Sequence, residues 1–408
     1  MAPAGNHFDD DVRGLSPLLA RGMISRRGAL AGAGGIGLAA ALAACGTSGT
    51  AKKADASKQA APSDVSSAEK LVNWSNWPEY IDVDDKTKKH PTLNAFTKKT
   101  GIKVKYAEDY NDNDEFFAKV KPQLSAGADT GRDVWCSTDW MVARLVRLNW
   151  VQKLDKANIP NAKNLQPSLE KVEFDPGRVY SLPWQSGFTG IGYNPKTSGG
   201  AITSMDQLLH DRKLKGRVTL LTEMHDTVGM MMLAMGKDPD NFTDADFDAA
   251  IKELQAAKTR GQLKGFTGNE YGKGLASGEI AACLAWTGDV VQLKADNPRL
   301  GYVLPSTGHM LWSDNFVIPN KAKHKKNAET LIDYYYQPEV MAAVVDYVNY
   351  LPVVAGAEPI LKKDDPDVAK NPLIFPTQAV LARAHGFRGL SEDEETRYNK
   401  AFQNLIGG

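Results

Sequence analysis

The chain has little of the chemistry on which most enzymes and disulfide-rich proteins depend. Its 408 residues include only three cysteines and seven histidines. Three cysteines cannot build a disulfide scaffold. No HxxxH or HExxH metal motif, GxSxG nucleophile turn, P-loop or CxxC pair occurs in the sequence. The sequence therefore predicts a protein that is not an enzyme and needs no metal or cofactor.

Net charge and long apolar runs are also missing. The 49 Lys and Arg residues balance 49 Asp and Glu residues, so the composition does not predict nucleic acid or an anionic membrane surface as a partner. After the first fifty residues, no apolar run approaches the ~20 residues that span a bilayer. With 42% hydrophobic residues, a chain of this length can build two or three domain-sized cores.

Residues 1–45 have the pattern of an export signal. Arginines within residues 21–27 precede residues 29–44, which are only Ala, Gly, Leu and Ile. A basic segment followed by a short apolar segment is typical of secretion signals. The arginine pair also resembles a twin-arginine signal, and the twin-arginine and general export routes both remain open. Residues 42–46, Leu-Ala-Ala-Cys-Gly, resemble a bacterial lipobox, which predicts that Cys45 is lipidated.

Residues 46–68 have the composition of a flexible tether. They are rich in Ser, Ala, Lys and Thr and contain almost nothing to bury. A tether after a lipidated cysteine would hold a folded body close to a membrane without crossing it. We therefore expect a lipid-anchored protein at the extracytoplasmic face of the bacterial cell membrane, or in the periplasm.

From residue 70 onward, strand and helix patterns alternate. Apolar and alternating stretches predict strands at 71–74, 102–106, 133–136, 218–221 and 280–286. Capping and proline signals predict helices at 91–100, from Asp114, from Thr243, at 328–336 and at 339–348. Such alternation predicts an α/β fold in two halves, each a sheet flanked by helices, with a ligand cleft between them. Cys136 and Cys283 fall in different halves, and we expect both to be free buried thiols.

Five tryptophans lie in loops or at the ends of predicted strands: Trp77, Trp140, Trp184, Trp286 and Trp312. Three of them have a carboxylate nearby in sequence, namely Glu79, Asp289 and Asp314. An aromatic face attracts a cation, and a carboxylate adds a charge-assisted hydrogen bond to an ammonium group. The repeated pairing favours an amine ligand. Because sugars also stack on tryptophan, a carbohydrate ligand remains an alternative.

Five motifs, in this order, resemble the spermidine/putrescine-binding proteins of ABC transporters: Asn76-Trp77-Pro78-Glu79-Tyr80, Tyr180-Ser181-Leu182-Pro183, Gly190-Ile191-Gly192-Tyr193-Asn194, Ala285-Trp286-Thr287-Gly288-Asp289 and Leu311-Trp312-Ser313-Asp314. The resemblance implies a two-lobed, hinged periplasmic-binding-protein-like fold of type II, each lobe a mainly parallel sheet flanked by helices. Lobe 1 would comprise residues 69–187 plus 313–358, and lobe 2 residues 188–312 plus 359–408. A monomer of this kind closes on its ligand and delivers it to an ABC permease and ATPase complex.

Carried over position by position, the resemblance implies a ligand site made of Trp77, Glu79, Tyr80, Thr138, Trp140, Glu223, Asp226, Trp286, Trp312, Asp314 and Tyr350. Asp314 matches the acidic residue that grips an amine in that family. The chain departs from the family at three positions. Met224 and Thr227 replace two carboxylates, although a one-residue shift to Glu223 and Asp226 would restore them, and Arg388 replaces a glutamine.

The resulting hypothesis is capture of a di- or polyamine resembling spermidine or putrescine. Arg388 would oppose a long polyamine, unless it neutralises a spare carboxylate. An unpaired Arg388 facing the cleft would favour the alternative of a sugar or another small cationic or zwitterionic solute. A further alternative, an extracytoplasmic enzyme on the same fold, would need a nucleophile–base pair in the cleft.

Overall fold

The computed structural model describes residues 64–84 and 86–407. The expected export signal, the lipidation site at Cys45 and residues 46–63 of the expected tether lie outside the described residues. Within the described part of the chain, no helix is long and apolar enough to cross a membrane.

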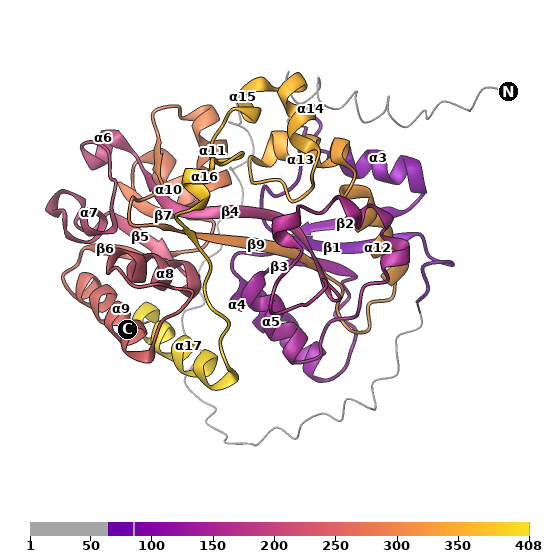
Figure 1. Ribbon diagram of the computed structural model, residues 1–408, viewed down its shortest axis with the longest axis horizontal. Coiled ribbons are helices and arrows are strands. Elements are labelled where there is room, and N and C mark those ends of the chain that lie inside the picture. The colour runs from indigo at the N-terminus through magenta and orange to yellow at the C-terminus, as the bar shows by residue number, and fades with distance from the viewer. Residues whose placement is uncertain (1–63, 85, 408) are drawn as a thin grey trace.

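One sheet of ten strands runs through the molecule (Figure 1), and its main path has the order β2-β1-β3-β9-β4-β7-β5-β6. The strands on this path are β1 (Leu71–Asn76), β2 (Lys103–Glu108), β3 (Val134–Thr138), β4 (Ser181–Tyr193), β5 (Val218–Leu221), β6 (Leu263–Thr267), β7 (Ala282–Trp286) and β9 (His309–Val317). Two short strands pair at its side, β8 (Gly301–Val303) with β4 and β10 (Ala384–His385) with β9. Strands β1–β3 are parallel to one another, as are β5–β7.

Helices flank both halves of this sheet. The first half carries α3 (Pro91–Thr100), α4 (Asn113–Ser125), α5 (Asp139–Arg147), α12 (Lys325–Tyr335), α13 (Pro338–Val348), α14 (Ala357–Asp364) and α15 (Pro366–Ala369). The second half carries α6 (Pro195–Ser198), α7 (Met205–His210), α8 (Met224–Ala234), α9 (Asp244–Thr259), α10 (Tyr271–Ser277), α11 (Thr287–Asp296), α16 (Gln378–Leu381) and α17 (Glu392–Gly407). Short 3-10 turns lie at Lys156–Asn158, Pro160–Asn164, Pro167–Leu169 and Arg212–Leu214. The predicted α/β fold class is therefore confirmed.

Short-range signals set most helix ends. Helix α3 starts at Pro91, which has no backbone N–H to leave unpaired there. Helix α9 starts with a capping box formed by Thr243 and Asp246, as predicted. Helix α4 differs from the prediction, because Asp112 rather than Asp114 is its N-cap. Asp112 has the extended backbone that an N-cap needs, whereas Asp114 already lies in the first turn.

Strands β4 and β9 run through both halves of the molecule. Residues 181–189 of β4 pair with β9, and residues 189–193 pair with β7 in the second half. Residues 314–317 of β9 pair with β3 in the first half. The expected lobe boundaries at 187/188 and 312/313 fall where Gly187 pairs with Trp312. The hinged motion of the two halves stays a prediction.

Residues 359–369 pack with the first half of the molecule, whereas the resemblance implied that they belong to lobe 2. Residues 359–369, expected in lobe 2, form most of α14 and α15, and α14 packs on α13 of the first half. Leu361 of α14 is fully buried. Burial of this apolar helix face keeps the segment with the first half.

Residues 64–68 at the end of the expected tether are held against the body. The backbone N–H of Val65 donates to the carbonyl of Lys323 at 2.8 Å, and the Ser66 hydroxyl accepts from the N–H of Asn327. Ser66 is buried. The described chain is therefore fastened to the start of α12 before its first strand begins.

Aromatic side chains dominate the core of the first half. Trp74 packs against Trp184, Phe316 and Tyr335 with ring centroids 5.4–5.6 Å apart. Trp184 is fully buried, so this member of the five tryptophans belongs to the core. Cys136 and Cys283 are both free and buried, as predicted.

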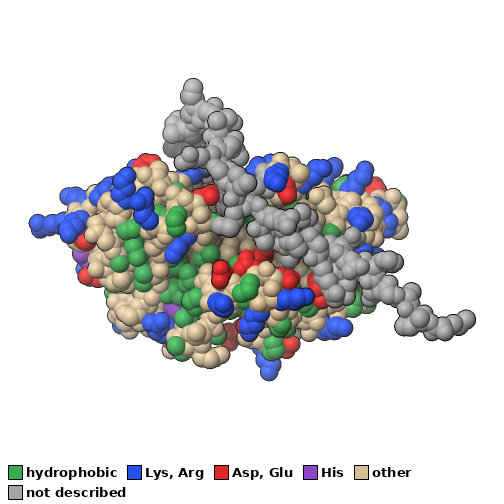
Figure 2. All heavy atoms as spheres, turned by 90° about the horizontal axis from the view of Figure 1, so that it is seen from above, with side chains coloured by type: hydrophobic (Ala, Val, Ile, Leu, Met, Phe, Trp, Pro, Cys, Tyr) green, Lys and Arg blue, Asp and Glu red, His purple; other side chains and the backbone are tan. Residues whose placement is uncertain are grey.

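The molecular surface carries charges of both signs. On the face shown in Figure 2, Lys and Arg side chains are spread over both halves, and Asp and Glu side chains gather near the middle.

Candidate functional site

A small cavity lies between the two halves, beside the paired strands β4 and β9. Its volume is about 30 Å³, which is room for one or two water-sized groups. Its lining combines aromatic and acidic side chains with single hydroxyl and amide groups: Trp77, Thr138, Glu223, Asp226, Asn269, Trp286, Trp312, Asp314 and Tyr350. Eight of these nine residues belong to the set that the sequence predicted, and Asn269 does not.

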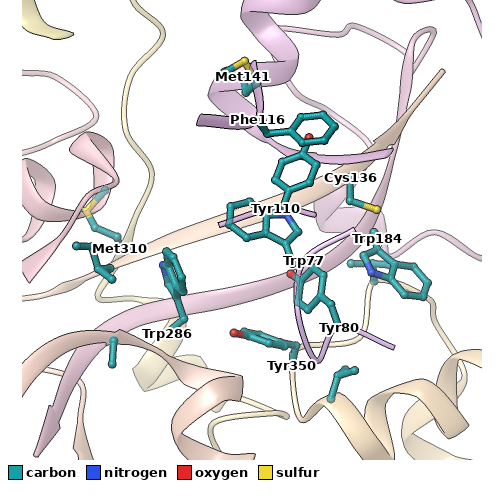
Figure 3. Packing of buried hydrophobic residues seen from close by; sticks show 14 of the residues in the cluster. Trp77, Tyr80, Tyr110, Phe116, Cys136, Met141, Trp184, Trp286, Met310 and Tyr350 are labelled. Carbon is teal, nitrogen blue, oxygen red and sulfur yellow. The ribbon is translucent and has the colours of Figure 1, made fainter. Parts of the chain in front are cut away.

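Four aromatic rings form the walls, and Figure 3 shows three of them, Trp77, Trp286 and Tyr350, arranged around one space. The ring centroids of Trp77 and Trp286 are 6.0 Å apart at an interplanar angle of 73°. Trp286 and Trp312 are 6.5 Å apart, and Trp312 and Tyr350 are 5.5 Å apart. Neighbouring rings meet edge to face. Their exposed faces can therefore contact either an alkyl chain or a cation.

Asp314 contributes a buried carboxyl group from β9. Its Oδ1 accepts a hydrogen bond from the Thr138 hydroxyl at 2.6 Å, and its Oδ2 accepts one from the Tyr80 hydroxyl at 2.7 Å. Burial raises the pKa of Asp314 to about 7. These neutral donors orient the carboxyl group without neutralising its charge.

Asp226, from α8, presents a second carboxyl group held in the same way. Its Oδ1 accepts from the Thr189 hydroxyl at 2.5 Å, and its Oδ2 accepts from the indole N–H of Trp286 at 3.2 Å. Burial raises the pKa of Asp226 to about 6. None of the nine lining residues is Lys or Arg, so the cavity wall itself supplies no counter-ion.

Glu223 connects the two halves across the cavity. It stands at the N-cap position of α8 but does not cap that helix. Its Oε1 instead accepts hydrogen bonds from the backbone N–H and the side-chain amide of Asn113, both at 2.9 Å. Asn113 begins α4 of the first half, so a carboxylate of one half lies at a helix N-terminus of the other. Burial and the nearby Asp112 raise the pKa of Glu223.

Asn269 and its neighbour Asp289 complete the second-half side of the site. The Asn269 amide donates to Asp289 Oδ2 at 3.0 Å, and the Tyr350 hydroxyl donates to Asp289 Oδ1 at 2.6 Å. The buried Oδ1 of Asn269 has no hydrogen-bond partner within the described chain. Sequence reasoning missed Asn269 because it lies in a plain loop after β6, with no motif around it.

The other predicted site residues lie outside this cavity. Tyr80 is buried behind Asp314 and donates to it. Glu79 is exposed and accepts a hydrogen bond from the Tyr347 hydroxyl at 3.1 Å. Trp140 lines an adjoining, larger cavity. These three residues were predicted from resemblance in sequence, which does not determine the direction of a side chain.

The structure places each residue at which the chain departs from the family pattern, namely Met224, Thr227 and Arg388. Glu223 and Asp226 line the cavity, whereas Met224 and Thr227 are buried and do not line it. Arg388 lines the adjoining cavity, but its guanidinium donates to Glu394 at 2.7 Å. That guanidinium also lies 4.1 Å from the centroid of the Phe242 ring. Arg388 therefore neutralises a carboxylate, and the unpaired Arg388 that would favour a zwitterionic solute is not found.

One group of described side chains has the geometry to hold a metal ion. Potential ligand atoms of Asp238, Asp240 and His385 lie within 4.8 Å of one another. The two aspartates are exposed. Because exposed acidic groups gather without a metal in many proteins and no second feature supports an ion here, we assign no metal site.

The chain is similar to known proteins along most of its length. The chain is 28% identical over 348 residues to the spermidine/putrescine-binding periplasmic protein 1 of Haemophilus influenzae, covering 85% of this chain and 90% of that protein. It is 28% identical over 337 residues to the putrescine-binding periplasmic protein PotF of Escherichia coli, covering 78% of this chain and 86% of that protein.

Solved structures show the same fold. The spermidine/putrescine ABC transporter substrate-binding protein PotD of Streptococcus pneumoniae matches with a TM-score of 0.66 at 23% identity, covering 82% of this chain and 98% of that chain. This likeness confirms the expected two-lobed periplasmic-binding-protein fold. A family profile described as bacterial extracellular solute-binding protein matches residues 92–377. The chain therefore belongs to the bacterial extracellular solute-binding proteins.

Proposed function

We propose that this protein captures an aliphatic di- or polyamine between its two halves. The observation that carries the proposal is the pair of buried carboxyl groups, Asp226 and Asp314, in an aromatic cavity lined by no Lys or Arg. A buried carboxylate without a counter-ion costs free energy, and a ligand ammonium group offsets that cost. The relatives are named as spermidine/putrescine-binding and putrescine-binding proteins, and these names support the same class of ligand.

Each part of the site has a role in this proposal. One ammonium group lies between Asp314 and Asp226 and donates hydrogen bonds to their oxygens. The Asn269 Oδ1 offers it a further acceptor. The methylene chain packs against the tryptophan rings, which exclude water. The protein binds and releases the amine and catalyses no reaction. As a monomer, it delivers the amine to an ABC permease and ATPase complex.

The alternative ligands have weaker support. A sugar is recognised by several neutral polar groups, and the cavity offers one amide, Asn269, and one aliphatic hydroxyl, Thr138, beside its acidic side chains. A zwitterionic solute needs a cation for its carboxylate, and Arg388 is paired with Glu394. No specific observation therefore favours either alternative over an amine.

Replacing Asp314 by Asn tests the proposed amine site. The variant keeps the shape of the side chain but removes the charge, so a buried ammonium loses its partner. We expect putrescine and spermidine to bind roughly 100-fold more weakly, about 3 kcal/mol, in isothermal titration calorimetry. Asp346→Asn is the matched control, because burial also raises the pKa of Asp346 to about 7 but the residue lies on α13, outside the cavity. Equal affinities of both variants would contradict the proposal.

Affinity for the amine should rise with pH. The raised pKa values of Asp314, about 7, and Asp226, about 6, mean that both carboxyl groups of the empty site are largely protonated under acidic conditions. An ammonium ligand favours the ionised carboxylates, so binding displaces protons and weakens as the pH falls through these values. We expect affinity to increase from about pH 5 to about pH 8 and then level off.

Calorimetry in two buffers of different ionisation enthalpy measures this proton release directly. In the Asp314→Asn variant, the part of the pH dependence close to neutrality should disappear. A wild-type affinity that does not change over the same pH range would show that these carboxyl groups do not meet the cation.

Closure of two lobes on the ligand is part of the proposal. The lobes are those expected from the sequence, 69–187 plus 313–358 and 188–312 plus 359–408, with residues 359–369 moving with the first because α14 packs on α13. Several contacts join the halves in this structure. The Tyr350 hydroxyl donates to Asp289, and Arg144 and Arg147 of α5 both donate to Glu395 of α17. Such contacts form only when the halves are together.

Gly268 provides a test of closure. A Cβ atom at this position would lie 2.6 Å from the carbonyl oxygen of Asn111 on the opposite half. Gly268→Ala should therefore hold the ligand-saturated protein more open, seen as a larger radius of gyration in small-angle scattering, and weaken amine binding about tenfold. In Gly265→Ala, the control, an added Cβ meets no atom within 4 Å. A Gly268→Ala protein as compact as the control would contradict this closed arrangement.

Export and lipid anchoring through Cys45 complete the proposal. They are supported by the signal-like residues 21–46 and by the periplasmic location named for the relatives. We expect the native protein, extracted from membranes, to begin at an acylated Cys45 by intact mass spectrometry. A Cys45→Ser variant should lack the lipid mass and leave the membrane fraction. A native protein that retains unmodified residues before Cys45 would overturn this part.

A further inference from the structure

The small cavity cannot hold a whole di- or polyamine. The part of the ligand that lies outside it must therefore fit the surroundings of the small cavity. Its volume of about 30 Å³ fits one ammonium-sized group. An adjoining cavity of about 500 Å³ shares three lining residues with it, Thr138, Asp226 and Trp312. Given the proposed amine site, a ligand with its ammonium in the small cavity extends past these residues into the larger one.

The inner wall of the larger cavity is aromatic and comes from both halves. Trp140 of α5 stacks on His225 of α8, with ring centroids 4.4 Å apart and an interplanar angle of 17°. Phe387, from the segment after β10, meets His225 edge to face at 4.6 Å. Leu390 and Phe174 extend this wall. Such a surface stabilises an apolar group that enters it.

His225 adds an uncharged ring to this wall. Its side chain is buried, and its Nδ1 has no hydrogen-bond partner among the described residues. Burial, together with the nearby Arg144, lowers the pKa of the imidazole to about 3. The ring is therefore uncharged at neutral pH and offers an uncharged aromatic surface rather than a cation.

Apart from Asp226, the carboxylates of the larger cavity that are not fully exposed already have a cation nearby. Glu395 accepts from Arg144 and Arg147. Asp139 accepts from the Asn315 side chain at 2.7 Å and interacts electrostatically with Arg178. Asp226, whose partners are neutral, is shared with the small cavity. Two further acids, Glu173 and Asp240, are exposed to water, where an ion pair contributes little. Arg147 and Arg388 also line this cavity, and they are already paired with Glu395 and Glu394. Beyond Asp226, a second ammonium group therefore finds no buried carboxylate in this cavity that lacks a nearby cation.

We propose that the ligand is an amine with an uncharged, largely apolar arm, of the class of N-acylated diamines. Its free ammonium end occupies the small cavity, and its acyl arm fills the larger cavity against the wall formed by Trp140, His225 and Phe387. Because that wall is assembled from both halves, the arm also favours the closed arrangement.

Titration calorimetry of the purified protein with four probes tests this inference: putrescine, spermidine, N-acetylputrescine and N-benzoylputrescine. We expect N-benzoylputrescine to bind most tightly, about tenfold or more tighter than spermidine, because its ring reaches the aromatic wall. If putrescine or spermidine binds at least as tightly as N-benzoylputrescine, the inference is wrong while the proposed amine site stands. If none of the four binds, the proposed function fails together with it.

Substitutions in the aromatic wall separate the contribution of the wall to ligand affinity from that of the ammonium site. Phe387→Ala should lower the ratio of N-benzoylputrescine affinity to putrescine affinity about tenfold. Leu381→Ala is the control, because Leu381 is an exposed apolar residue on α16 that does not line the cavity. Phe387 is half-buried, and thermal unfolding will verify that the variant folds. An unchanged ratio in a folded Phe387→Ala protein would overturn the inference.

Discussion

The antiparallel pair of strands β4 and β9 is the constraint on which the rest of this structure depends. The pair joins the two halves of the sheet and also carries the site. Gly187 of β4 pairs with Trp312 of β9, and a Cβ atom at Gly187 would lie 2.6 Å from the Trp312 ring. The missing side chain therefore makes room for one wall of the cavity. Two residues farther along β9, Asp314 lies opposite Thr138 of β3, which orients its carboxyl group.

Around this strand pair, the site combines buried carboxyl groups with uncharged hydrogen-bond donors. Hydroxyl and indole groups hold Asp226 and Asp314, and they orient both carboxyl groups without neutralising them. In the proposed function, the ligand supplies the favourable term that offsets their burial. Amine binding and proton release would then be linked, because both depend on the same buried carboxyl groups.

In the proposed binding mode, the two cavities divide the recognition of a ligand. The small cavity would recognise charge, since its carboxyl groups have no counter-ion in the wall. The larger cavity would recognise shape and apolar surface, since apart from the shared Asp226 its less exposed carboxylates have a cation nearby. Arg388 illustrates the difference. It occupies a position where a cation could oppose a polyamine, yet its guanidinium pairs with Glu394 and packs on Phe242.

Much of the candidate site was open to prediction from the sequence, but the role of each tryptophan was not. Trp184 and Trp286 were both among the five tryptophans that the sequence placed in loops or at strand ends. Trp184 is buried in the core beside Trp74, whereas Trp286 faces the cavity and donates to Asp226. The two residues lie on different strands, and Trp184 stands at an irregularity of β4 between Pro183 and Gln185. Whether such a residue meets a core or a cleft depends on the neighbouring strands.

The amino-acid sequence by itself determined the α/β class, the positions of strands β1, β2, β3, β5 and β7 and of five helices, and the association of aromatic with acidic residues. These features depend on short-range periodicity, capping and composition, which a linear chain carries within a few residues. The sequence did not predict the long strands β4 and β9 that join the two halves. Only the tertiary structure decided that Glu79 is exposed, that Asn269 joins the cavity and that Glu223 meets Asn113 across it. Those outcomes depend on contacts between segments more than a hundred residues apart, and side chains reach each other there only after the two halves pack together.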